Sequence, residues 1–189
     1  NVIGYVNNNA TTTVIIGAHY DHLGHGEDGS AMVTANEKKV FNGADDNASG
    51  VAALLSILEE LSNSKMKPKR SIIFIAFSGE EAGLLGSKYF VDHLPIPKND
   101  LKLMVNMDMV GRLNAQHHLY MGGAGTFPDG VDLMKKLGKN SGLNLIVHAG
   151  EVGGSDHVSF YKSNISCIGF HTGGHPQYHT PEDDIQFIN

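Results

Sequence analysis

Continuous apolar runs, rather than alternating ones, mark the segments of this chain that are expected to form strands. Residues 13–18 and 71–77 are apolar and rich in β-branched side chains, without the alternation of a half-exposed strand. Such runs are typical of strands that are covered on both faces. The pattern therefore predicts two central strands, which lead into His19 and into residues 78–81. Shorter apolar runs predict further strands over residues 1–6, 103–107, near Leu119, 143–147 and 165–170.

Amphipathic segments separate these strands. After Asn47, which can cap a helix, apolar residues recur at the spacing of one helical face: Val51, Leu54, Leu55, Leu58 and Leu61. Similar reasoning predicts helices over about 84–93, 130–140 and after Ser155. Because strands and helices alternate, we expect a three-layer α/β/α fold with a central, mainly parallel mixed sheet. The polar stretch 20–44 is too long for an ordinary turn, and we interpret it as a functional loop.

Length, composition and charge narrow the class of protein. With 189 residues, 41% hydrophobic and 18% charged, the chain is expected to be a single folded domain over 1–189. A net charge of −6 and no long basic run argue against nucleic acid or an anionic membrane surface as partner. No apolar run approaches the ~18 residues of a membrane span. Because the chain begins at Asn1 without a leader, we expect it to be a piece of a longer precursor.

Histidine is abundant, whereas Cys167 is the single cysteine: the chain contains 11 histidines. A metal ion would therefore be held by imidazole and carboxylate rather than thiolate. In open α/β sheets, sites form beyond the carboxyl ends of the strands. Four candidate ligands follow predicted strands at that edge: His19, Glu80, Glu81 and Asp108.

Other chemistries lack their sequence motifs. The chain contains neither phosphate-binding glycine fingerprint and no helical H-E-x-x-H zinc motif. Residues 153–157 begin like a serine nucleophile elbow, but His157 stands where its last glycine must be. Asp46 precedes a helix, where its carboxylate could reach two ions. The adjacent Glu80 and Glu81 would suit one metal ligand and one proton acceptor.

Six blocks of the sequence resemble, in order, those of the co-catalytic di-zinc exopeptidases related to aminopeptidase Y and the bacterial leucyl aminopeptidases. The blocks are GAHYD (17–21), NGADDNASG (42–50), SGEEAGLLGS (78–87), NMDM (106–109), SDH (155–157) and YHT (178–180). The resemblance covers about residues 2–184. It implies a secreted or periplasmic enzyme whose C-terminal helix is missing after residue 189.

The resemblance also implies a metal centre with two Zn²⁺ ions per chain. Asp46 would bridge the ions. His19 and Asp108 would complete the ligands of one ion, and Glu81 and His179 those of the other.

Three further residues receive catalytic roles from the resemblance. Glu80 would be the general base for a metal-bridging hydroxide. The carboxylate of Asp21 would hold the His19 imidazole in its ligating tautomer. Tyr178 would donate a hydrogen bond to the developing oxyanion.

These roles predict an aminopeptidase that removes the first residue of peptides with a free N-terminus. A carboxypeptidase or dipeptidase on the same centre, or a glutaminyl cyclase with a single zinc, is the alternative within the enzymes. A non-catalytic, receptor-like binding domain is a further alternative, against which the complete ligand set argues. Neither the preferred side chain nor the oligomeric state follows from the sequence.

We expect the remaining polar residues not to take part in the metal centre. We interpret Asp45 as a loop residue rather than a ligand, and residues 155–157 as shaping the substrate side. Loops 122–128 and 148–154 are expected to form the pocket walls. Five histidines are expected to be solvated surface groups: His22, His25, His93, His117 and His118.

Overall fold

A central mixed sheet organises the computed structural model, which describes residues 1–27, 30–32, 39–65, 67–150 and 152–189. Within these residues the sheet has seven strands in the order β1-β3-β2-β4-β7-β5-β6. The strands are β1 (Val2–Val6), β2 (Thr13–His19), β3 (Ser71–Phe77), β4 (Leu101–Met107), β5 (His118–Gly122), β6 (Asn144–Val147) and β7 (Cys167–His171). Strand β2 pairs in parallel with β3 and β4, β4 with β7, and β5 with β6, whereas the β1–β3 and β5–β7 pairs are antiparallel.

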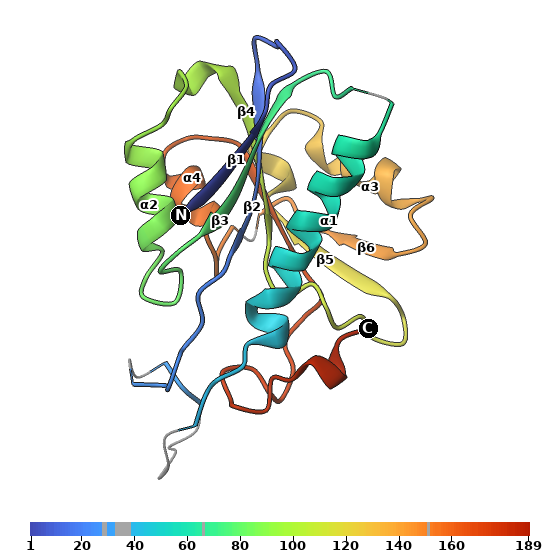
Figure 1. The fold of residues 1–189 in the computed structure, drawn as a ribbon. Helices are drawn as coiled ribbons and strands as arrows, with labels where there is room; N and C mark the ends of the chain where they lie inside the picture. Colours follow the sequence, from blue (N-terminus) through green and yellow to red (C-terminus); the bar gives the residue numbers. More distant parts are fainter. Residues whose placement is uncertain (28–29, 33–38, 66, 151) are drawn as a thin grey trace.

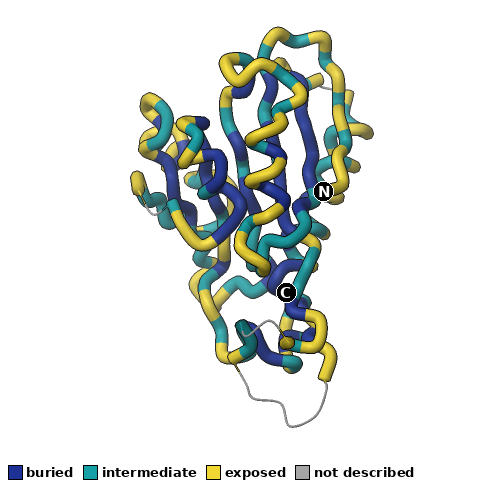
Figure 2. The backbone as a smooth tube through the Cα atoms, turned by 90° about the vertical axis from the view of Figure 1, so that its left-hand side faces the viewer, coloured by how far each residue is buried: buried dark blue, intermediate teal, exposed yellow. Residues whose placement is uncertain are grey.

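Helices cover both faces of this sheet (Figure 1). The α-helices are α1 (Gly50–Asn63), α2 (Leu85–Asp92), α3 (Gly130–Gly138) and α4 (His157–Lys162). Short helical turns are η1 (Ala44–Ser49), η2 (Lys98–Asp100), η3 (Ala124–Thr126) and η4 (Ile185–Phe187). Figure 2 shows the buried backbone concentrated in the strands, with exposed turns on the helices around them.

The side chains of β3 show why the fold has three layers. Ile73, Ile75 and Phe77 belong to the cluster that includes Phe90 of α2 and Phe160 of α4. Because successive strand residues point to opposite faces, Ile72 and Phe74 instead join Leu54 of α1. A third cluster joins Met134 of α3 to β5 and β7. The predicted α/β/α architecture and the two fully covered central strands are therefore confirmed.

The start of α1 differs from the prediction. The regular helix begins at Gly50, because Asp46 and Asn47 have non-helical backbone angles within η1. The Asn47 side chain still serves the helix end, since its Oδ1 accepts a hydrogen bond from the Gly50 N–H at 3.0 Å. A Cβ at Gly50 would lie 2.5 Å from the carbonyl oxygen of Met107, so this glycine lets α1 approach the end of β4 closely.

The predicted loop 20–44 is only partly described, because residues 28–29 and 33–38 lie outside the described residues. Its described parts contain neither helix nor strand before Ala44. Among all described residues, no helix combines the length and the apolar character needed to cross a membrane.

Candidate metal centre and active site

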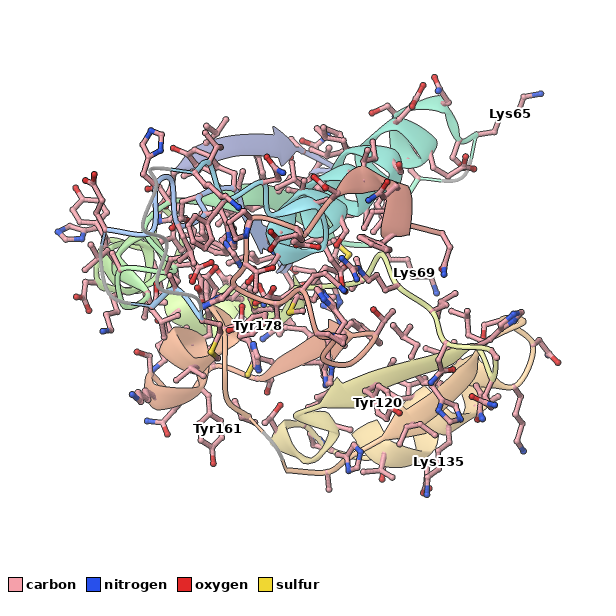
Figure 3. The ribbon with its side chains drawn as sticks, turned by 90° about the horizontal axis from the view of Figure 1, so that it is seen from below. Lys65, Lys69, Tyr120, Lys135, Tyr161 and Tyr178 are labelled. Atoms are coloured by element: carbon pink, nitrogen blue, oxygen red, sulfur yellow. The ribbon has the colours of Figure 1, made fainter. Side chains whose placement is uncertain are left out.

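The strand order β3-β2-β4 brings the candidate residues together at one edge of the sheet. These three parallel strands are adjacent, so the residues at their carboxyl ends converge: His19, Glu80, Glu81 and Asp108. Asp46 comes from η1, and His179 from the turn that follows β7. Figure 3 looks onto this end of the molecule, with Tyr178 near the centre of the view and Lys65 and Lys135 towards its periphery.

The two carboxylate oxygens of Asp46 face two different groups of ligand atoms. Asp46 Oδ1 lies 3.3 Å from His19 Nε2, which in turn lies 3.3 Å from Asp108 Oδ1. Asp46 Oδ2 lies 3.2 Å from His179 Nε2, which lies 3.3 Å from Glu81 Oε2. The centre therefore consists of two sets of three atoms that share one carboxylate.

These separations fit zinc coordination. Ligands at about 2.0 Å from a tetrahedral ion lie about 3.3 Å from one another, which is the spacing observed within each set. Among the described residues, His19 Nε2, His179 Nε2 and Asp108 Oδ1 are buried without a hydrogen-bond partner. Buried polar atoms are normally satisfied, so their convergence without hydrogen bonds indicates a place for a cation.

Backbone carbonyl groups set the tautomer of both histidines. His19 Nδ1 lies 3.0 Å from the carbonyl oxygen of Asp21, and His179 Nδ1 lies 2.9 Å from that of Ser30. An Nδ1–H donor leaves the lone pair of Nε2 free for a metal ion. Both imidazoles are thus oriented with Nε2 towards the shared carboxylate.

The Asp21 contact differs from the expected one. The main-chain carbonyl of Asp21, rather than its carboxylate, meets His19 within hydrogen-bond distance, and the nearest carboxylate oxygen lies 3.9 Å away. The two carboxylate oxygens instead accept the backbone N–H groups of Glu80 and Glu81 at 3.1 and 3.2 Å. Asp21 therefore orients the glutamate pair as well as the imidazole.

The electrostatics of the centre favour positive charge. Burial lowers the pKa of His19, but the adjacent carboxylates of Asp108 and Asp46 outweigh burial and raise that pKa to about 12. Burial likewise lowers the pKa of His179, while Asp46 and the Ser30 carbonyl raise it to about 9. In the opposite direction, burial raises the pKa of Asp46, but the two histidines hold it below its usual range. The carboxylates that favour a positive charge on the two buried imidazoles would also attract a metal cation.

Glu80 and Tyr178 lie beside the two sets of ligand atoms. Burial raises the pKa of Glu80 to about 8, helped by the negative charges of Asp108, Asp156 and Glu81. Burial and the nearby carboxylates also raise the pKa of Tyr178, whose ring stacks on the His179 ring at 3.8 Å between centroids. Both groups therefore keep their protons at neutral pH in the absence of a metal ion.

The interpretation of His22 as a solvated surface group is wrong. Its side chain is only 9% exposed, and its Nδ1 lies 2.8 Å from Glu81 Oε1. The position of His22 three residues after His19, directly after the GAHYD block, is the signal that could have pointed to this contact. His25, His93 and His117 are exposed as expected, whereas His118 is half-buried.

Asp45 is a fully buried support rather than an ordinary loop residue. Its Oδ1 accepts the Gly111 N–H at 2.7 Å, and its Oδ2 lies 3.2 Å from His175 Nε2. The buried Asp183 accepts the backbone N–H groups of Asp45 and Asp46 at 2.9 and 3.0 Å and pairs with Arg112 at 2.6 Å. No sequence pattern singles out His175, Asp183 or Arg112, although Asp183 follows closely after the YHT block.

A cavity of about 440 Å³ adjoins the metal centre through Asp108. Met109, Val152 and Phe170 contribute apolar walls, and Ser155 and His157 contribute polar ones. Of the two loops that were expected to form walls, loop 148–154 does so through residues 152–154, whereas loop 122–128 contributes only Gly122, the last residue of β5. Asp156 is completely buried, and burial raises its pKa to about 6.

Comparisons with known proteins agree with this geometry. The sequence is 35% identical over 162 residues to aminopeptidase YwaD of Bacillus subtilis, covering 78% of this chain and 34% of that protein. The structure matches that of BSAP, a zinc aminopeptidase from Bacillus subtilis, with a TM-score of 0.73 and 30% identity over 99% of this chain and 44% of that one.

A glutaminyl cyclase from Porphyromonas gingivalis has the same fold, with a TM-score of 0.76 and 23% identity over 99% of this chain and 70% of that one. The chain thus spans about a third of YwaD and less than half of BSAP. The model of peptidase family M28 matches residues 1–189 from end to end. Together with the α/β/α fold, this match shows that the chain belongs to peptidase family M28.

Proposed function

We propose that this domain is an aminopeptidase that uses two zinc ions. The observation that carries the proposal is the position of the Asp46 carboxylate between two sets of ligand atoms. Its Oδ1 lies 3.3 Å from His19 Nε2, and its Oδ2 lies 3.2 Å from His179 Nε2. His19 and Asp108 would hold the first ion, and Glu81 and His179 the second. The names of the relatives support this choice, since BSAP is described as a zinc aminopeptidase.

With two zinc ions in place, the protein itself would have to supply a group that accepts and returns a proton during peptide hydrolysis. When bound, zinc supplies Lewis acidity and lowers the pKa of water for nucleophilic attack on a peptide carbonyl. Glu80 is not within either set of ligand atoms, and its carboxylate would accept the proton of the attacking water. The same proton would pass from Glu80 to the leaving amine, which closes the cycle. Burial raises the pKa of Glu80 to about 8 without a metal ion, and bound cations would lower it, so that the ionised carboxylate could accept a proton at neutral pH.

Tyr178 and Asp21 would assist this transfer in different ways. Tyr178 keeps its phenolic proton because burial and nearby carboxylates raise its pKa, so it can donate a hydrogen bond to the carbonyl oxygen of the scissile bond. Asp21 would hold the backbone of Glu80 and Glu81 in place through its two accepted N–H bonds.

The charge and shape of the site favour a free N-terminus and an apolar first residue. The carboxylates of Glu80, Glu81 and Asp108 would attract the substrate's amino group. The adjoining cavity of about 440 Å³ would take the first side chain between Met109, Val152 and Phe170. A secreted or periplasmic location, implied by the sequence resemblance, stays a prediction.

Peptides with free and acetylated N-termini test this proposal. With zinc present, a leucyl reporter peptide should be hydrolysed, and its acetylated form should not, because acetylation removes the charge that the carboxylates bind. Cleavage of acetylated peptides from their carboxyl end at a comparable rate would identify a carboxypeptidase. Release of pyroglutamyl products from glutaminyl peptides, without hydrolysis, would identify a glutaminyl cyclase. Binding of peptides without turnover would identify a binding domain.

A further inference from the structure

His22 makes the closest polar contact with the proposed zinc ligand Glu81. Its Nδ1 lies 2.8 Å from Glu81 Oε1, while the other carboxylate oxygen, Oε2, faces His179 Nε2 at 3.3 Å. Both side chains are nearly buried, with exposed fractions of 9% for His22 and 8% for Glu81. The carboxylate of Glu81 is thus divided between one imidazole on each side.

His22 could be a zinc ligand or a hydrogen-bond donor to Glu81, and its distances to the neighbouring carboxylates distinguish these two roles. Together with Asp46 and Glu81, His22 forms a group of side chains able to surround a metal ion. However, its Nδ1 lies 4.0 Å from Asp46 Oδ2, longer than the ~3.3 Å between tetrahedral zinc ligands. Its 2.8 Å contact with Glu81 is shorter than that spacing and is typical of a hydrogen bond to a carboxylate. His179 matches the ligand spacing to both carboxylates, whereas His22 matches it to neither.

The geometry points to His22 as a positioning residue for Glu81, an inference that rests on the proposed two-zinc function. Its Nδ1–H donates to Oε1, so that Oε2 is presented as the single zinc-binding atom. Hydrogen bonds to metal ligands from outside the coordination shell orient those ligands and typically change metal affinity by about 10–100-fold. The effect is confined to the ion held by Glu81 and His179, because His22 makes no hydrogen bond to His19 or Asp108 among the described residues.

The surroundings of His22 hold its ring in this orientation. A Cβ at Gly43 would lie 2.6 Å from His22 Cγ, and the φ angle of Gly43 is +62°, so a glycine is required beside the ring. On another side, the His22 and His179 rings meet edge to face, with centroids 5.8 Å apart. The imidazole is therefore packed before any metal ion binds.

Zinc titration of matched variants tests the inference without using activity. Zinc is titrated into metal-free wild type, H22A, H22N and the exposed-histidine control H25A, in competition with a chromophoric chelator. H22A should weaken one of two zinc sites by about 10–100-fold and leave the other unchanged. H22N should recover most of the affinity, because the asparagine amide N–H can replace Nδ1–H. H25A should behave as wild type, and circular dichroism of each variant confirms that it is folded.

Other results of the titration would point to a different role for His22 or to a different number of zinc ions. Equal loss in H22N and H22A would overturn the inference and make His22 a zinc ligand, since an amide N–H cannot bind zinc. Equal weakening of both sites would reduce His22 to a general structural role. A wild type that binds one zinc would refute the two-ion function. The His22 inference would then survive only if H22A weakened that single site and H22N restored it.

Discussion

Glu80 and Glu81 are adjacent and chemically identical, so only their positions can separate their roles. Oε2 of Glu81 faces His179 Nε2 at 3.3 Å, within the spacing of zinc ligands, whereas burial raises the pKa of Glu80 to about 8. Proximity in sequence thus carries no information about which carboxylate binds the ion. The contact of Glu81 with His179 supports Glu81 as the proposed ligand.

Exchanging each glutamate for glutamine separates the roles experimentally. Glu81→Gln should weaken one zinc ion and lower activity, and added zinc should partly restore that activity. Glu80→Gln should retain both ions, but its kcat should fall by about 10²–10⁴-fold, because a positioned general base typically contributes that much to the rate. Metal content and kcat are measured for both variants. Loss of a metal from Glu80→Gln, with both retained in Glu81→Gln, would reverse the assignment.

His157 predicts a specific acid sensitivity. Burial lowers its pKa to about 4 from 6.5, so the unfolded chain takes up a proton at a pH where the folded protein does not. Its contribution to stability is complete above pH 6.5 and is lost as the pH falls towards 4. Between pH 7 and pH 5, urea unfolding should show about 2 kcal/mol less stability from this group.

The glutamine variant isolates this contribution. The free energy of unfolding of His157→Gln minus that of wild type should increase by about 2 kcal/mol on going from pH 7 to pH 5, because only wild type loses the contribution of this imidazole. His93→Gln, which removes an exposed imidazole, serves as the matched control. A wild-type-minus-variant difference that is the same at both pH values would contradict the assignment to His157.

At the level of elements, η1 carries Asp46, the proposed shared ligand, and hydrogen bonds to the C-terminal segment support this turn. Asp183 accepts the N–H groups of Asp45 and Asp46, and Arg112 neutralises its charge. Arg112 also donates to Gln177 at 2.8 Å and lies over the Phe187 ring at 4.7 Å. The turn that supplies His179 is thereby tied to the turn that supplies Asp46.

Asp183→Ala should therefore affect both stability and both zinc sites. Removing one partner of a buried ion pair costs about 3–5 kcal/mol, because the other charge remains buried. Since Asp46 is shared, both zinc affinities should fall, unlike the single loss expected for H22A. Urea unfolding and zinc titration measure the two effects, with the exposed neighbour Glu182→Ala as control. Wild-type affinity for both ions in Asp183→Ala would show that Asp46 needs no such support.

At the level of the whole molecule, the proposed ligands connect segments that are distant in the chain. They come from the ends of β2, β3 and β4, from η1 and from the turn at residue 179. An ion bound there would link both sequence halves at one edge of the sheet. Metal binding should therefore be coupled to folding of the entire domain.

Removal of zinc should lower the melting temperature. At a free zinc concentration 100 times Kd, each ion stabilises the folded state by about 2.7 kcal/mol. For a domain of this size, that corresponds to roughly 5–10 °C in Tm per ion. Calorimetry of the zinc-loaded protein before and after dialysis against a chelator measures the shift, and added zinc should reverse it. An unchanged Tm would argue that zinc does not bind the folded domain.

The sequence by itself determined the layers of the fold and the residues that could meet at its edge. Continuous apolar runs at 13–18 and 71–77 predicted central strands, because burial on both faces leaves no polar alternation. The parallel arrangement then placed His19, Glu81 and Asp108 at the same edge. These predictions succeeded because hydrophobic periodicity is a local property of the chain, and because strands that alternate with helices usually lie parallel in one sheet.

Only the tertiary structure decided which atoms meet. The contact between His22 and Glu81 spans 59 residues, and that between Asp45 and Asp183 spans 138. Neither has a periodic signal, so His22 looked like a surface histidine and Asp183 was not identified. The Asp21 carboxylate likewise binds the N–H groups of Glu80 and Glu81 instead of the predicted imidazole, because the ends of β2 and β3 lie side by side. Such partners depend on how separate segments pack, which residue type and spacing along the chain do not specify.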